Sequence, residues 1–275
     1  MNKIVIPFRT VMMALGALAI LTGCGRREKA REIIVPERQV VNENLNFESY
    51  TFDLIGEYTA TDTFENPAGR YIRYTGEGIL PKSLGEGGIR NLRDSLMRMA
   101  RVSFDGDRNP VPMIGQDSVR LSNLQPSEVS PLSFIESEMS ASLVSPRVVT
   151  FECDRSGYFY GAAHGNKSVG YVNYYLTEGK ILSLDDLMNP GYRNKLLRLI
   201  RAALKESEVE LLVNPSGVDV ASQFVITTEG LTFTYDPYEI APYSEGVVTV
   251  DIPLESLLEE GLLSRDGRII LTGEP

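Results

Sequence analysis

The chain has 275 residues, and its 37 acidic against 27 basic side chains give a formal net charge of −10. This balance argues against nucleic acid as a partner, because such binding depends on Lys and Arg neutralising phosphates. It suits a basic partner, or simply solubility. The length is sufficient for one packed core or for two coupled halves.

The N-terminus has the features of an export signal. Two basic residues precede an almost entirely apolar stretch at residues 11–21. This stretch is shorter than the roughly 20 residues that a membrane-spanning helix needs, and its length is typical of a signal peptide. It ends in Leu-Thr-Gly-Cys, which resembles the lipobox of bacterial lipoproteins. The sequence therefore predicts a signal peptide over residues 1–23 and a lipid on Cys24.

A lipid on Cys24 would hold the protein to a membrane of the cell envelope, facing the periplasm or the cell surface. Two or more acyl chains anchor a protein firmly without crossing the bilayer. Residues 24–46 lack a sustained period and contain Pro36, so we expect a tether. Only Cys153 then remains as a thiol, which excludes an intramolecular disulfide. Its place in an alternating segment predicts a small buried side chain.

Residues 47–130 are expected to form an N-terminal α/β half. Alternating apolar residues at 50–54 and an apolar run at 71–74, separated by a break that contains Pro and Gly, predict an antiparallel pair of strands. An apolar stripe from 89 to 104, spaced three and four residues apart, predicts a helix. Residues 105–131 are rich in Pro, Gly, Asp and Ser, so we expect a long irregular connection.

Residues 131–275 are expected to form a C-terminal domain that begins with strands. Apolar runs predict strands at 148–153 and 158–160 around a turn at 154–157, followed by a strand at 168–176. After this last strand comes Thr-Glu-Gly, a tripeptide that recurs later between two further apolar runs. Because its glycine suits the left-handed backbone of a short loop, both copies predict β-hairpins.

The remaining elements of this domain complete the fold class. A helix is predicted at 190–205, with Asn189 as its N-cap and Pro190 in the first position. A strand at 247–252, a short helix at 253–260 and a last strand at 269–271 follow. Hairpins with interposed helices predict an α+β fold, with a mixed, mainly antiparallel sheet packed against two principal helices.

His164, the only histidine, lies among small residues that allow a sharp turn near other loops. One histidine and one remaining cysteine are too few for a zinc site. The spaced acidic loop of an EF-hand is absent, although the carboxylates leave a calcium or magnesium site open as an alternative. We expect neither a metal nor a cofactor. A histidine can serve a serine as general base, but no Gly-x-Ser-x-Gly motif is present. Since a lone histidine is usually structural, we expect no enzymatic activity.

A second segment, residues 235–246, combines three tyrosines, two prolines and three acids directly after a predicted hairpin. Prolines lower the ordering cost of binding, and tyrosines supply rigid amphipathic contact area. The alternative is a loop that folds back and uses its tyrosines as core. The sequence alone does not decide between a recognition loop and a core segment.

Several motifs carry a family resemblance. They are Tyr-Gly-Ala-Ala-His-Gly-Asn at 160–166, Asn173-Tyr174, Thr-x-Gly-Lys-x-Leu-x-Leu-x-Asp-Leu at 177–187, and Phe-x-Ile-Thr through Pro-Tyr-Glu-Ile-Ala-Pro-Tyr at 224–243. Over residues 145–260 they resemble the extracytoplasmic domain of RsiV-type anti-sigma factors, a domain of unknown function in many other envelope proteins. Ala162 stands where that family more often has a second glycine.

The resemblance implies a receptor domain, because the RsiV-type domain binds lysozyme, a basic protein. It makes two loops candidates for a shared recognition face: His164, Gly165 and Asn166, and Pro237, Tyr238, Glu239, Pro242 and Tyr243.

RsiV-type proteins also have a cytoplasmic sigma-binding segment and a transmembrane helix, which the predicted lipoprotein replaces with a signal peptide and lipid. We therefore expect a monomeric binding module without sigma-factor output. A cell-wall glycan-modifying enzyme and a structural envelope lipoprotein are the alternatives.

Overall fold

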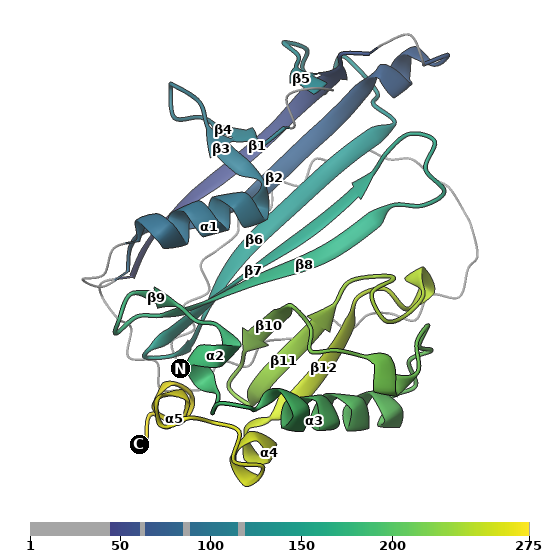
Figure 1. The fold of residues 1–275 in the computed structure, drawn as a ribbon. Coiled ribbons are helices and arrows are strands. Elements are labelled where there is room, and N and C mark those ends of the chain that lie inside the picture. The colour runs from purple at the N-terminus through teal and green to yellow at the C-terminus, as the bar shows by residue number, and fades with distance from the viewer. Residues whose placement is uncertain (1–44, 61–63, 85–88, 115–118, 275) are drawn as a thin grey trace, which may run out of the picture. The chain divides into compact units, whose positions relative to one another are not determined.

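A seven-stranded sheet is the largest element of the computed structural model, which describes residues 45–60, 64–84, 89–114 and 119–274 (Figure 1). The expected signal peptide, Cys24 and the tether up to residue 44 lie outside the described residues. Residues 41–275 form one compact unit. Among the described helices, none has both the length and the apolar character needed to cross a membrane.

The strands of this sheet lie in the order β5, β1, β2, β6, β7, β8, β9. All neighbours run antiparallel except β2 and β6, which are parallel. Their bounds are β1 (Leu45–Tyr58), β2 (Tyr71–Leu84), β5 (Val119–Leu121), β6 (Ser133–Ser145), β7 (Val148–Tyr158), β8 (Asn166–Tyr175) and β9 (Lys180–Ile181).

One face of the sheet packs against α1 (Arg90–Ala100), which the hairpin of β3 (Val102–Phe104) and β4 (Pro110–Pro112) follows. Leu92 and Leu96 on α1 are fully buried against sheet residues that include Met139 and Phe151. Burying a side chain of this size stabilises a fold by about 1.5–3 kcal/mol. The predicted helix is confirmed but ends earlier, because Arg101 takes a left-handed backbone with φ of 52°.

Cys153 lies in the same core. Its side chain is fully buried, as expected, and burial raises the pKa of the thiol to about 12.

A second sheet of β10 (Gln223–Ile226), β11 (Gly230–Tyr235) and β12 (Val248–Pro253) packs against α3 (Arg193–Glu206) (Figure 1). Its core joins Leu196 and Ile200 of α3 to Phe233 and Val250 of the strands. The chain also forms α2 (Leu184–Leu187), α4 (Leu254–Glu259) and α5 (Arg265–Thr272), with 3₁₀ turns η1 (Pro67–Arg70), η2 (Pro215–Gly217) and η3 (Tyr243–Glu245). The predicted α+β class is confirmed.

Both predicted Thr-Glu-Gly hairpins are present. Gly179, between β8 and β9, has a φ of 65°, and Gly230, at the start of β11, has a φ of 150°. At Gly230 a Cβ atom would lie 2.2 Å from the carbonyl oxygen of Ile252. The glycine therefore supplies both a backbone conformation and close strand packing.

The predicted turn at 154–157 is wrong. This segment continues β7, because residues 154–157 pair with β6 on one side and β8 on the other. Sequence patterning also missed β6, whose exposed positions after Phe134 are Glu and Ser. It placed β4 and β5 in an irregular connection.

Two further predictions, the strand at 269–271 and the helix cap at Asn189, are also wrong. Residues 269–271 belong to helix α5 rather than to a strand, and Ser264 caps this helix by accepting a hydrogen bond from the Gly267 backbone N–H. Asn189 does not cap α3. Its side-chain amide instead donates to the carbonyl oxygens of Gly261 and Leu263, and α3 begins at Arg193.

The expected boundary near residue 130 falls between β5 and β6. Strands from both sides belong to the seven-stranded sheet, since β2 and β6 pair over Ile72–Gly78 and Ser133–Met139. The division of the chain into two halves therefore stays a prediction, and strands from both halves form one sheet.

Side chains of Gln223, in β10, and of Asp236, which follows β11, cap the edge of β8. Gln223 accepts a hydrogen bond from the Tyr171 backbone N–H, and Asp236 accepts one from Val169. The Asn173 side chain bonds the backbone of both Phe224 and Ile226 across this junction. Unpaired edge groups invite pairing with other chains. Here the hydrogen bond from the Val169 N–H to Asp236 holds the segment after β11 beside the start of β8.

Candidate functional site

The His164 loop connects β7 to β8. It turns at residues 159–162, where the Ala162 backbone N–H donates to the Phe159 carbonyl. A Cβ atom at Gly165 would lie 2.9 Å from the backbone oxygen of Gly157. Glycine at 165 therefore allows the loop to close tightly over the end of β7, as the small residues around His164 predicted.

The tyrosine loop runs from Asp236 to Gly246, after β11. Tyr238 adopts a left-handed backbone with φ of 70°, which costs a residue with a side chain about 1–2 kcal/mol. Its backbone N–H donates to the Ala241 carbonyl, and the Asp236 N–H donates to the Glu239 carboxylate, each over 3.0 Å. These bonds hold the loop in a defined and strained form.

The two loops meet through three aromatic side chains, which we call the aromatic cluster: His164, Tyr238 and Tyr243. The rings of His164 and Tyr243 stack with centroids 4.1 Å apart. The Tyr238 hydroxyl and the His164 Nε2 atom lie 2.9 Å apart, within hydrogen-bond distance. The tyrosine rings themselves are 6.0 Å apart at their centroids.

The candidate residues separate into three groups. Tyr238 has 55% of its surface exposed, and His164 is exposed too, so the cluster faces solvent. Residues 235–246 therefore contain both an exposed tyrosine, as a recognition loop would, and a core tyrosine, since Tyr235 is only 1% exposed. Partly buried residues support the loops: Gly165, Pro237, Pro242 and Tyr243. Asn166 and Glu239 are exposed, one paired with Gly157 in the ladder and the other bonded back to Asp236.

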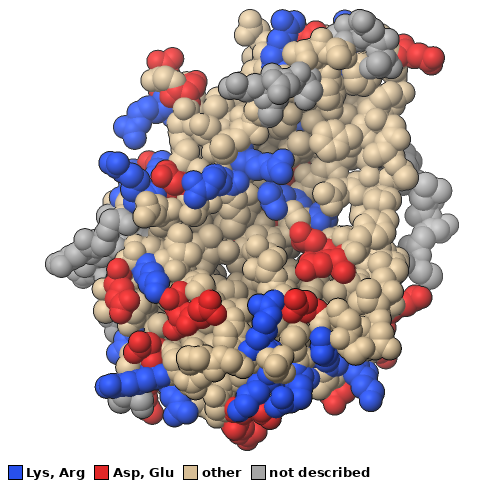
Figure 2. Space-filling view, viewed as in Figure 1, with Lys and Arg blue, Asp and Glu red and all other residues tan. Residues whose placement is uncertain are grey.

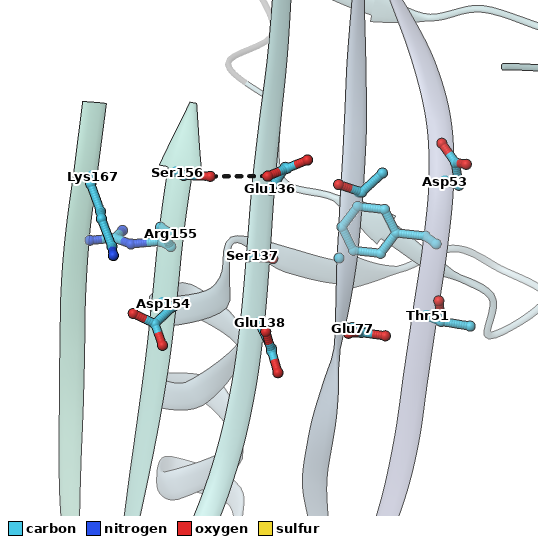
Figure 3. A pocket seen from close by; sticks show the side chains of 13 residues that line it. Thr51, Asp53, Glu77, Glu136, Ser137, Glu138, Asp154, Arg155, Ser156 and Lys167 are labelled. Carbon is cyan, nitrogen blue, oxygen red and sulfur yellow. Dashed lines mark hydrogen bonds between the residues drawn. The ribbon is translucent and has the colours of Figure 1, made fainter. Parts of the chain in front are cut away.

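The sheet face opposite α1 has a hollow of about 560 Å³, which the sequence did not predict (Figure 3). Its lining includes the carboxylates of Asp53, Glu77, Glu136, Glu138 and Asp154, with Lys167 and Arg155 at one side. Lys167 directly follows Asn166 in β8, so the hollow lies near the His164 loop. Only the polar residues at every second position of β6 (Glu136, Glu138, Ser140 and Ser142) could have indicated this polar face.

Carboxylates crowd one another in this hollow. Glu138 stands opposite Glu77 on β2 and opposite Asp154 on β7. Burial raises the pKa of Glu138, and the charges of Glu77 and Asp154 raise it further. Glu152, next along β7, has its pKa raised by burial and then by Asp154 and Glu138. The face therefore carries an acidic potential that a positive partner would relieve.

Basic side chains are spread over α1 and around α3 on the face shown in Figure 2. Those of α3 secure neighbouring segments. Arg198 pairs with Glu260 over 3.3 Å, Lys195 donates to the Glu260 carbonyl, and Arg201 donates twice to the Val218 carbonyl.

The contacts of His164 join the two loops. Its ring atoms lie within hydrogen-bond distance of the Gly165 carbonyl and the Tyr238 hydroxyl, and no serine or carboxylate of the described residues bonds to it. Within the same described ranges, no three His, Cys, Asp or Glu side chains group as metal ligands would.

Residues 185–255 match the model of DUF3298, a protein family of unknown function. This span holds α3 and β10 to β12 with the tyrosine loop, whereas His164 precedes it. No curated protein matches the chain.

Two solved structures are similar to this chain. A DUF3298 family member from Bacteroides fragilis NCTC 9343 superposes with a TM-score of 0.58 and 19% identity, covering 84% of this chain and 100% of its own. A DUF3298 family protein from Pseudomonas aeruginosa PAO1 has a TM-score of 0.49 and 18% identity, with 81% and 95% covered. At this identity the first relative shows a common fold and assigns no activity.

Proposed function

We propose that the protein is a membrane-anchored envelope module that binds a basic, lysozyme-like protein through the aromatic cluster of His164, Tyr238 and Tyr243. One observation carries the proposal: Tyr238 is more than half exposed, yet its backbone is strained and its hydroxyl lies within hydrogen-bond distance of a second loop. Strained backbones persist where the surrounding structure holds them, and they concentrate at binding sites.

Preorganisation supports a binding role for this surface. A tyrosine that is already ordered loses little side-chain freedom when a partner covers it. The His164 and Tyr243 rings stack at 4.1 Å between centroids, and the Tyr238 ring lies 6.0 Å from that of Tyr243, so the three rings hold one another in place. Binding hot spots are enriched in tyrosine, and truncating a hot-spot side chain to alanine weakens binding by about 2 kcal/mol or more.

Charge supports a basic partner. The acidic hollow near the His164 loop contains five carboxylates, and Glu77, Glu138 and Asp154 have no ion-pair partner among the described residues. Complementary potentials mainly accelerate encounter and select partners. We therefore assign attraction to the hollow and close contact to the aromatic cluster.

The location in the envelope is part of the proposal and depends on the lipobox resemblance at Cys24. A lipid there would keep the whole folded unit outside the cytoplasm, where basic wall-active proteins occur. The same anchor would leave no segment for a sigma factor. The proposed role is thus capture of the partner at the membrane surface, without catalysis.

Single substitutions test whether the cluster is the contact surface. We expect Tyr238→Ala in residues 41–275 to weaken lysozyme binding by about 30-fold, corresponding to a hot-spot loss of about 2 kcal/mol. The control is Phe159→Ala, which removes a similarly exposed aromatic ring (50%) that lies on the β7–β8 connection with His164 but outside the cluster. Calorimetric dissociation constants for the three proteins provide the comparison.

Equal affinities for wild type and Tyr238→Ala would remove the cluster from the interface. Because an exposed aromatic surface also stacks on sugar rings, the same titration is run with soluble cell-wall glycan fragments. Heat with the glycan and none with lysozyme would move the function to glycan binding.

A further inference from the structure

The β3–β4 hairpin lies against β1, beyond the C-terminal end of α1 (Figure 1). Between this hairpin and the large sheet is a second hollow, of about 190 Å³, which we call the hairpin pocket. Its walls are mainly apolar and include the side chains of Phe52, Tyr58, Ile135 and Phe159. Pockets for drug-sized ligands measure roughly 300–1,000 Å³, so only a small molecule would fit here.

Two hydroxyl groups line this pocket without a hydrogen-bond partner in the described part of the chain, those of Tyr74 and Ser137. Both residues are more than nine-tenths buried, with 6% and 9% of their surface exposed. Burying a hydroxyl without a hydrogen bond is unfavourable, and the great majority of buried polar groups in native proteins are paired. The pocket therefore offers two hydrogen-bonding groups that a bound polar molecule would satisfy.

The two hydroxyls belong to different parts of the pocket. A Cβ atom at Gly76 would lie 2.3 Å from the Phe52 ring and 3.0 Å from the Ser137 Oγ atom. Glycine at this position therefore lets the Phe52 ring lie across β2, beside the Ser137 hydroxyl. Ser137 and the Phe52 ring together form a floor that is flat, apolar and able to make one hydrogen bond.

Arg101 supplies a positive charge at the mouth of the pocket. It is exposed, as are the lining residues Met113 (47%) and Phe159 (50%), so the pocket reaches the surface here. The Arg101 carbonyl accepts a hydrogen bond from the Met113 N–H over 2.7 Å, which fixes its backbone to the hairpin. Its guanidinium makes no ion pair with any described residue. Burial and then Tyr58 raise the pKa of Tyr74 to about 12, whereas the charge of Arg101 lowers it, so this charge acts on the Tyr74 hydroxyl.

We propose that the hairpin pocket binds a small aromatic monocarboxylate. Its carboxylate pairs with the Arg101 guanidinium and accepts a hydrogen bond from the Tyr74 hydroxyl, since hydrogen bonds to an ionised acceptor are the stronger ones. Its ring lies between Phe52 and Ile135, where a polar substituent reaches the Ser137 hydroxyl. One guanidinium neutralises one carboxylate, which favours a monoanion over a dicarboxylate. This site is separate from the aromatic cluster and does not depend on its partner.

The compound 4-hydroxyphenylacetate is the probe that tests the site. It is titrated into residues 41–275, which contain every described core cluster. The ¹³C-labelled methyl group of Met113 reports on the pocket mouth by nuclear magnetic resonance, and that of Met188, in the core of the second sheet, is the internal reference. We expect the Met113 signal to shift saturably, with a dissociation constant of about 1 mM or lower, and the Met188 signal to stay in place.

Two variants and one altered ligand test the proposed contacts. Arg101→Gln removes the charge, and Tyr74→Phe removes only the hydroxyl, so each should weaken binding of the probe about ten-fold. The neutral amide of the probe should bind the wild type at least about ten-fold more weakly than the acid. Arg98→Gln is the matched control, because Arg98 is an exposed arginine of α1 that does not line the pocket, and it should keep the wild-type affinity.

The melting temperature of each variant shows that the fold survives. Three results would overturn the proposal: a Met113 signal that does not move up to about 10 mM probe, equal affinities for the acid and its amide, or wild-type affinity in Arg101→Gln.

Discussion

The contacts of His164 fix the tautomer of its neutral ring. Its Nδ1 atom lies 2.7 Å from the Gly165 carbonyl, and a carbonyl oxygen can only accept a hydrogen bond. Nδ1 must therefore carry the hydrogen, which leaves Nε2 of the neutral ring as an acceptor. The Tyr238 hydroxyl then donates to Nε2, so that one histidine links the backbone of its own loop to the other loop.

Nuclear magnetic resonance tests this assignment at the level of single atoms. We expect the neutral ring to be almost entirely the Nδ1–H tautomer, since only that form makes both bonds. The ¹⁵N shifts of the two ring nitrogens distinguish the tautomers directly. In Tyr238→Phe the Nε2 partner is lost, and the preference should weaken. A dominant Nε2–H form in the wild type would contradict the described geometry.

At the scale of elements, the two faces of the large sheet differ in polarity. The face against α1 is apolar and closed where the helix covers it, whereas the opposite face sets Glu138 between Glu77 and Asp154 on neighbouring strands. Natural sheets usually place opposite charges at such positions, because like charges across strands are destabilising. We expect these like charges to lower the stability of the fold, a cost that the proposed binding role of this face would explain.

Glu138→Gln measures that loss. The pKa of Glu138 is raised in the folded protein, so the folded state holds its proton more tightly and stability falls as pH rises from the usual glutamate pKa to the raised one. We expect the variant to gain about 0.5 kcal/mol at neutral pH and nothing below the usual pKa. Urea unfolding at several pH values measures both limits.

Glu210→Gln removes the same charge from an exposed position outside the helices and strands, and should change little. A Glu138→Gln variant less stable than wild type at neutral pH would show that the carboxylates are not in conflict.

Local patterns predicted most of the elements, and the failures have physical causes. Residues 269–271 resemble a strand by composition, but Gly267 lies so close to Leu187 that a Cβ atom would be 1.9 Å from its carbonyl oxygen. That tertiary contact, with the Ser264 cap, establishes the helix. β6 escaped prediction because two of its buried positions, Ser133 and Ser137, are polar, so that apolar and polar residues do not alternate along it.

At the scale of the whole molecule, the sequence placed the candidate site better than its surroundings. The loops of His164 and Tyr238 were predicted to share a face, and the structure brings these two residues within 2.9 Å. The acidic hollow was not foreseen, because its carboxylates come from strands far apart in the chain and only the sheet register sets them together. The match of residues 185–255 to DUF3298 and the shared fold assign no activity, so the proposed function rests on this geometry.

The most direct test of the central claim is a calorimetric titration of residues 41–275 with lysozyme at low and at moderate salt. We expect saturable binding at low salt and a several-fold weaker affinity at moderate salt, because screening shortens the reach of the acidic hollow to about 8 Å at physiological ionic strength. Absence of binding heat at both salt concentrations would contradict the assignment of this surface to a basic, lysozyme-like partner.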